Sequence, residues 1–235
     1  MRIAVTGLDF SEGKVKYEDA IVLALADKFS PKKVTPYYFE FIYDDYESAN
    51  IVVIARNRIL DLLIQDIEKV ETRRDRTADP NERAVLDRVL DDLEREIPVC
   101  AGRFEKHEES YIRTLSPLSF KPTLVIDSDP SGVNNLGPNE IIPQAMAVAN
   151  LMFFYTAGKK EVRAWLVDRG TSAQGCAGKI HSDLAQGFVK AEIISVDDLL
   201  ECHNMQDARQ RGLTRLVDRD FILPENTVLE IRFNV

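Results

Sequence analysis

The chain has 235 residues, of which 45% are hydrophobic and 29% charged, and this composition is typical of a water-soluble protein with one large or two modest cores. Its formal net charge of −9 argues against non-specific coating of nucleic acid, and we expect no DNA partner. No apolar run approaches the roughly 20 residues needed to cross a bilayer, and the N-terminal residues do not have the pattern of a signal peptide, so we expect a cytoplasmic protein. The three cysteines are far apart and fit neither a disulfide framework nor a zinc site, so we expect reduced thiols.

The charge is unevenly distributed along the chain. Residues 151–235 contain 11 Lys and Arg against 12 Asp and Glu, a net charge of −1, which leaves 19 against 27, a net charge of −8, for residues 1–150. A polyanion would therefore meet less repulsion at the C-terminal part than at the N-terminal part.

The first 56 residues have the pattern of an α/β layer. Arg2–Thr6 is a short β-prone run, and Tyr17–Lys28 has the broad apolar face of a helix. Two further strands are expected at Tyr37–Tyr43 and Asn50–Ala55. The unbroken β-branched run of the second suits a strand that is buried on both faces.

The segment after the first strand is similar to a phosphate-binding loop and departs from it. Such a loop has four residues between two glycines, then Lys and Ser or Thr, so that backbone amides surround the phosphates and the hydroxyl binds Mg²⁺. Here five residues, two of them acidic, separate Gly7 from Gly13, and Val15 stands where the hydroxyl is needed. With the loop placed between a strand and a helix, Gly7, Gly13 and Lys14 are candidates for residual nucleotide binding without hydrolysis. A loop kept for packing is the alternative.

Residues 57–111 are predicted to form a charged helical hairpin. Apolar residues recur at helical spacing in two segments, Ile59, Leu63, Ile67 and Val70, then Leu86, Leu90, Leu93 and Ile97. Between them, Asp79 is expected to cap the second helix, with Pro80 in its first turn and Glu82 reaching back in a capping box. The arginines at 73–76 are expected to lie in a solvated turn, with RNA contact as the alternative.

The strand expected at Lys121–Ile126 leads into a segment without a base-reading motif. A guanine site needs Asn or Thr, then Lys and a nearby Asp, at this place. The chain instead continues from Asp127 to Gly132 without Asn or Lys. We interpret Asp129 and Gly132 as parts of a proline turn and not as a metal motif.

The C-terminal 85 residues are predicted to form a small mixed domain. Strands are expected at 152–156, 162–167, 188–194, 219–223 and 227–233, with helical turns at 196–201 and 207–211. Either Thr171 or Ser172 can cap a further helix. We find no catalytic constellation here, and we interpret Trp165 as a core residue, with base stacking as the alternative.

Four polar residues are the candidates for a partner-binding surface in this domain: Arg163, Lys179, His181 and Lys190. Ordinary exposed charges are the alternative interpretation. No metal site is expected, because the adjacent Cys202 and His203 have no second ligand pair.

The segment that starts LMFFYTAGKKEVRAWLVDRG at Leu151, together with the terminal Arg232–Val235, resembles the C-terminal TGS domain of the YchF branch of Obg-like P-loop nucleotidases. The resemblance implies a β-grasp, ubiquitin-like fold for residues 151–235. For residues 1–150 it is patchy and implies a reduced P-loop-like α/β domain with the helical hairpin as an insertion, and DLLIQDIEKVETR is similar to the family's segment at that place.

Two classes of function follow from this resemblance and from the residues. The first is a non-hydrolytic binding protein without a cofactor, whose TGS domain docks on a ribosome, RNA or a protein partner. The second is a nucleotidase that binds ATP or GTP with magnesium through an atypical loop. We favour the first because the local chemistry of a site decides its function. Self-association through the helical hairpin is a third alternative.

Overall fold

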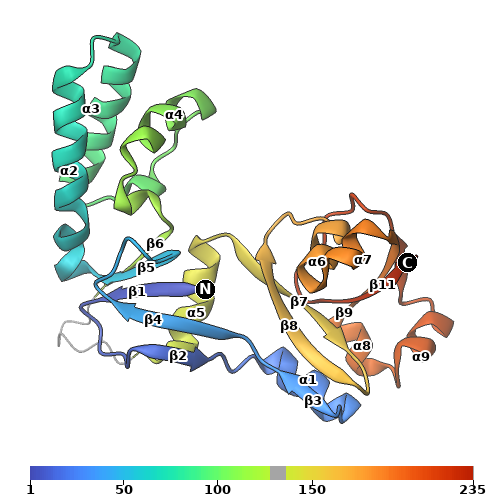
Figure 1. Ribbon diagram of the computed structural model, residues 1–235. Helices are drawn as coiled ribbons and strands as arrows, with labels where there is room; N and C mark the ends of the chain where they lie inside the picture. Colours follow the sequence, from blue (N-terminus) through green and yellow to red (C-terminus); the bar gives the residue numbers. More distant parts are fainter. Residues whose placement is uncertain (128–135, 235) are drawn as a thin grey trace. The chain divides into compact units, whose positions relative to one another are not determined.

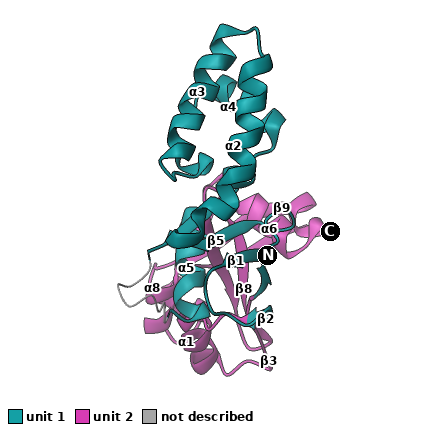
Figure 2. Cartoon of the chain, turned by 90° about the vertical axis from the view of Figure 1, so that its left-hand side faces the viewer, with its two compact units in different colours: residues 1–15, 39–149 teal, residues 16–38, 150–235 magenta. Residues whose placement is uncertain are grey.

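A computed structural model describes residues 1–127 and 136–234 (Figure 1). Asp129 and Gly132, interpreted above as parts of a turn, lie outside the described residues. The chain forms two compact units, one made of Met1–Val15 and Phe39–Ala149 and the other of Lys16–Tyr38 and Asn150–Val235 (Figure 2). The predicted division into 1–150 and 151–235 differs from this one because residues 16–38 pack with the C-terminal unit.

The first unit contains a five-stranded sheet in the order β2-β4-β1-β5-β6. Its strands are β1 (Arg2–Thr6), β2 (Gly13–Lys16), β4 (Tyr38–Tyr43), β5 (Ile51–Ala55) and β6 (Thr123–Ile126). Strand β1 pairs in parallel with β4 and β5, and β5 pairs in parallel with β6. All five residues of β5 are buried, as its β-branched run predicts.

The α-helices that the structure describes in this unit are α2 (Ile59–Arg76), α3 (Pro80–Glu94), α4 (Lys106–Leu115) and α5 (Pro138–Val148). Three single 3₁₀ turns cover Arg56–Arg58, Val99–Ala101 and Leu118–Phe120. Helices α2 and α3 lie side by side (Figure 1). Helix α2 spans the first segment of helical periodicity, whereas α3 ends at Glu94 and so includes the second segment without Ile97. Their apolar faces form one core with Ala4 of β1 and with Val52 and Ile54 of β5.

A buried carboxylate ties α2 to the start of β6. The side chain of Asp66 is fully buried and accepts hydrogen bonds from the backbone amides of Leu118 and Ser119, both at 2.7 Å. These amides begin the 3₁₀ turn that precedes β6. Asp66 therefore fixes where the chain returns from the helices to the sheet.

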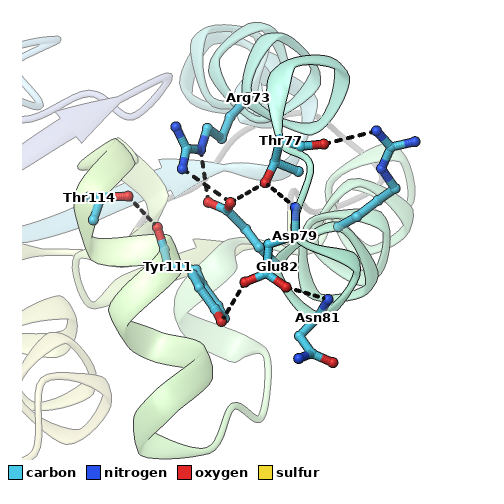
Figure 3. A network of polar contacts seen from close by, with 8 residues as sticks. Arg73, Thr77, Asp79, Asn81, Glu82, Tyr111 and Thr114 are labelled. Carbon is cyan, nitrogen blue, oxygen red and sulfur yellow. Dashed lines mark hydrogen bonds and ion pairs between the residues drawn. The ribbon is translucent and has the colours of Figure 1, made fainter.

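A second polar network joins the tips of α2 and α3 (Figure 3). Asp79 caps α3 as predicted and accepts a hydrogen bond from the amide of Asn81 at 2.9 Å. The capping box expected for Glu82 is wrong, because the buried Glu82 carboxylate accepts two hydrogen bonds from Arg73 and one from Thr77. Hydrogen bonding by Arg73 lowers the pKa of Glu82 despite its burial.

The second unit is built on a six-stranded sheet in the order β10-β9-β11-β7-β8-β3. Its strands are β3 (Lys33–Thr35), β7 (Leu151–Ala157), β8 (Glu161–Asp168), β9 (Phe188–Ser195), β10 (Arg215–Val217) and β11 (Thr227–Phe233). Its helices are α1 (Ala20–Phe29), α6 (Ala173–Ile180), α7 (Ser182–Gln186), α8 (Val196–Glu201) and α9 (Met205–Gln210). The strand expected at 219–223 is wrong: its Ile222 makes only an isolated bridge with Ser172.

The two faces of this sheet carry different helices. Met152 and Phe154 of β7 pack in one core with Cys176 and Ala177 of α6. The alternate residue Tyr155 turns to the other face and donates a hydrogen bond to Asp19, which caps α1. In the part of the chain that the structure describes, no helix has the length and apolar character needed to span a membrane.

We predict that Glu82→Gln lowers the free energy of unfolding of the first unit by about 1–3 kcal/mol, because a buried carboxylate loses its charge-assisted bonds. Urea titration followed by helical circular dichroism measures this change. The matched control is Asp75→Asn, which removes an exposed ion pair with Arg74 and should change stability by less than about 0.5 kcal/mol. Equal effects of the two substitutions would contradict the structural role of Glu82.

Candidate functional site

The loop that follows β1 is held against the core of the first unit. Thr6, at the end of β1, donates its hydroxyl to Asp44 at 2.7 Å. The backbone amide of Phe10 donates to the hydroxyl of Tyr43 at 3.0 Å, and the Phe10 ring stacks on Phe41 with ring centres 5.4 Å apart. The backbone amide of Phe10, in the middle of the loop, is therefore used in a hydrogen bond within the protein and is not directed toward a ligand.

The predicted position of this loop between a strand and a helix is wrong. Gly13–Lys16 forms strand β2 beside β4, and Lys14 lies exposed on that strand. The next helix, α1, begins at Ala20 and belongs to the second unit. A phosphate-binding loop aims backbone amides and a helix N-terminus at the phosphates. The described residues of this segment do not fit a magnesium nucleotide.

Gly7 has a packing role in this arrangement. Its φ of 73° lies in the left-handed region, and a Cβ at this position would approach Arg58 Cγ to 2.8 Å. Gly13 also has positive φ, at 121°, with open space around it. The two glycines therefore serve the turn that connects β1 to β2.

The four predicted surface residues of the C-terminal unit do not form one cluster. Arg163 lies on β8 with its guanidinium 3.7 Å from the centre of the Trp165 ring. Lys190 lies on the opposite face of the sheet and donates to Asp218 at 2.7 Å. Lys179 is exposed in the last turn of α6. His181 caps α7, because its Nδ1 accepts a hydrogen bond from the amide of Asp183 at 3.2 Å.

A large groove in the second unit was not predicted from the sequence. It has a volume of about 880 Å³ and lies where β7 and β11 diverge. Its walls include apolar side chains of Trp165, Ile180, Leu184 and Ile231, and cationic side chains of Lys28, Lys159, Lys160 and Arg209. The sequence signal for this site is the pair of lysines, Lys159 and Lys160, between the two strands expected at 152–156 and 162–167.

An ion-pair network supports one side of the groove. Buried Glu192 on β9 accepts hydrogen bonds from Arg209 of α9 at 2.8 Å and from Arg232 of β11 at 3.0 Å. Arg209 also pairs with Glu230 at 2.5 Å. Burial by itself raises the pKa of Glu192, but the hydrogen bonds from Arg209, Thr214 and Arg232 outweigh burial and lower its pKa to about 2.

Comparisons with known proteins give sequence matches that include the C-terminal residues. Residues 151–234 match the family described as "YchF-GTPase_C: Protein of unknown function (DUF933)". "Ribosome-binding ATPase YchF" of Mycoplasma genitalium is 43% identical over 46% of this chain and 29% of its own length. The Bacillus subtilis protein of the same name is 25% identical over 82% of this chain and 67% of its own length. Residues 151–234 of this chain are therefore YchF-like in sequence.

A solved structure extends the likeness of the YchF-like chain to nearly all of its length. The structure of the Schizosaccharomyces pombe YchF GTPase superposes with a TM-score of 0.74 and covers 96% of this chain and 88% of that one. At 18% identity, this likeness shows the fold alone. The chain spans between 29% and 67% of the length of the two curated relatives named above.

We predict that Glu192→Gln destabilises the second unit of this YchF-like protein by about 2–3 kcal/mol, because two arginines lose their buried counter-charge. Because the pKa is lowered from its ordinary 4.5 to about 2, the stabilisation is complete above pH 4.5 and is lost as the pH falls toward 2. Fluorescence of Trp165, the single tryptophan, reports unfolding of this unit. Asp218→Asn, which removes the exposed partner of Lys190, is the control and should have little effect.

Proposed function

We propose that this YchF-like chain is a binding protein that does not hydrolyse nucleotides, and that its C-terminal unit docks on the ribosome. The curated relatives are called ribosome-binding ATPases, and the family model that matches residues 151–234 falls within this unit. The proposal keeps the binding partner of those relatives and assigns the docking role to the C-terminal unit.

The observation that carries the first half of the proposal is the strand conformation of Gly13–Lys16. A triphosphate with its magnesium needs amides that converge on it, a lysine that reaches the outer phosphates and a metal-binding hydroxyl. Here Lys14 extends from an edge strand, and Val15 offers no oxygen. Two acidic side chains of the same loop, Asp9 and Glu12, would further repel phosphates.

The order of elements in the C-terminal unit supports a TGS domain of β-grasp fold. Antiparallel β7 and β8 form a hairpin, helices α6 and α7 follow, and β9 then pairs with β11 in the same mixed sheet. Helix α6 packs across the face formed by β7, β8 and β9. A hairpin that holds one helix across a mixed sheet is the arrangement that the resemblance implies.

A nucleotidase is the second candidate, and the names of the relatives favour it. The Bacillus subtilis protein, which is called an ATPase, aligns with 82% of this chain, including part of the first unit. On that reading, the chain would bind ATP or GTP through Gly7, Gly13 and Lys14 in a conformation other than the one described. Binding of nucleotide distinguishes the two candidates.

We predict that isothermal titration of the nucleotide-free chain with ATP or GTP and magnesium gives no binding in the micromolar range, because the loop supplies too few ligands for a triphosphate. The Bacillus subtilis relative serves as the positive control in the same buffer. Micromolar binding that is lost in Lys14→Ala would establish the nucleotidase and overturn the proposal.

We predict that the chain co-sediments with ribosomes and that Arg163→Glu, Lys179→Glu and Lys190→Glu together weaken this binding at least about tenfold, because ribosomal RNA repels the added carboxylates. The control carries the same charge change in the first unit, Lys14→Glu, Arg76→Glu and Lys106→Glu. A larger loss in this control would move the contact to the first unit and to its arginine-rich segment. Absence of co-sedimentation would end the ribosome proposal.

A further inference from the structure

Strand β11 has an edge without a partner strand inside its own sheet. It pairs with β9 from Thr227 to Phe233, but it meets β7 at one register position, Val228 opposite Tyr155. Beyond that position β7 continues with β8 into the hairpin turn. Among the described residues, the side of β11 that is turned away from β9 therefore borders the groove from Leu229 to Phe233 and has no partner strand there.

This edge offers backbone hydrogen-bonding groups to a ligand. In an antiparallel ladder, alternate residues turn their N–H and C=O groups away from the partner strand. About half of the backbone groups between Leu229 and Phe233 are thus directed away from β9. An open edge of this kind is a template for a further strand.

The two walls of the groove differ in chemistry. Leu229 and Ile231 face the core that contains Trp165, Ile180 and Leu184, so this wall is apolar. The alternate residue Glu230 points to the other face, where it pairs with Arg209. A strand inserted beside β11 would therefore place every second side chain on an apolar wall and the others on a charged wall.

The charge available to a ligand at this groove is positive. Glu161 is paired with Lys33 at 3.0 Å, and Glu230 is held by Arg209. Lys159 and Lys160 are exposed in the turn after β7, and neither has an acidic partner within ion-pair distance among the described residues. Carboxylates on a ligand would satisfy these two lysines.

We propose that the groove binds an extended polypeptide segment that alternates apolar and acidic residues and adds as a strand to β11. The inference deepens the proposed function, on which it rests, by naming the chemical class of partner that the C-terminal unit accepts. Backbone pairing with β11 supplies affinity, and the two walls supply specificity.

The side chains of the groove favour a polypeptide over single-stranded RNA. RNA would need an aromatic face for stacking, and the Trp165 ring is already stacked on Phe154 and covered by the Arg163 guanidinium.

The experiment uses the full chain and two capped synthetic peptides of about eight residues, which is within the usual length of a strand. One peptide alternates Val with Glu, and the other alternates Val with Lys. Calorimetry measures affinity, and amide hydrogen exchange by NMR measures protection of β11. We expect the Glu peptide to bind at least about tenfold more tightly than the Lys peptide and to protect amides between Leu229 and Phe233.

The variants test the walls separately from the fold. Lys159→Glu with Lys160→Glu should lower affinity for the Glu peptide at least about tenfold and raise affinity for the Lys peptide. Arg215→Glu with Arg219→Glu makes the same charge change outside the groove and should leave both affinities unchanged. The gain for the Lys peptide shows that the groove variant is folded.

Four outcomes would overturn the inference: equal affinity for both peptides, binding without protection of β11, protection of the whole β11 edge in the free chain by a second copy, and displacement of the peptide by single-stranded RNA. Ribosome co-sedimentation is measured on the same samples. Peptide binding without co-sedimentation would overturn the ribosome proposal and support the inference, and co-sedimentation without peptide binding would do the reverse.

Discussion

The pairing of Gly13–Lys16 with β4 is the constraint on which the organisation of this chain depends. In a phosphate-binding loop, these residues would begin a helix that packs on the sheet of their own unit. As a strand, they lead the chain out of the first unit, and the next helix, α1, packs in the second. One local conformation therefore replaces the expected helix start with a strand and also leads the chain to the helix that packs on the C-terminal sheet.

Buried carboxylates stabilise each unit where distant segments meet. Asp66 accepts hydrogen bonds from two backbone amides, and Glu82 accepts them from Arg73 and Thr77. Glu192 accepts hydrogen bonds from two arginines. Each joins elements that are not neighbours within one helix or strand. Because a buried charge is costly without partners, each arrangement tolerates little displacement of the segments that it joins. The side of the groove formed by α9 and β11 is fixed in this way.

Local signals in the sequence predicted some elements correctly, and non-local contacts decided the others. The Asp79 cap and the helix after Pro80 follow from neighbouring residues, and the β-branched run at 51–55 predicted a buried strand. The strand at Gly13–Lys16 was missed because a Gly-Lys pair indicates a loop, although its alternation of exposed lysines around Val15 is typical of an edge strand. Glu82 was given a local partner, but its real partner, Arg73, lies on the preceding helix. The groove was missed because it depends on where β7 and β11 diverge, which no single segment encodes.

The discontinuous second unit has a consequence for how the protein is made. Its strand β11 lies between β9 and β7 in the sheet, yet it is synthesised long after α1. More than a hundred residues are synthesised between α1 and β7, so the apolar face of α1 cannot pack on its sheet until long after the helix has been made. A fragment that starts at residue 150 would lack α1, so this unit is not a module that recombination could move by a single cut.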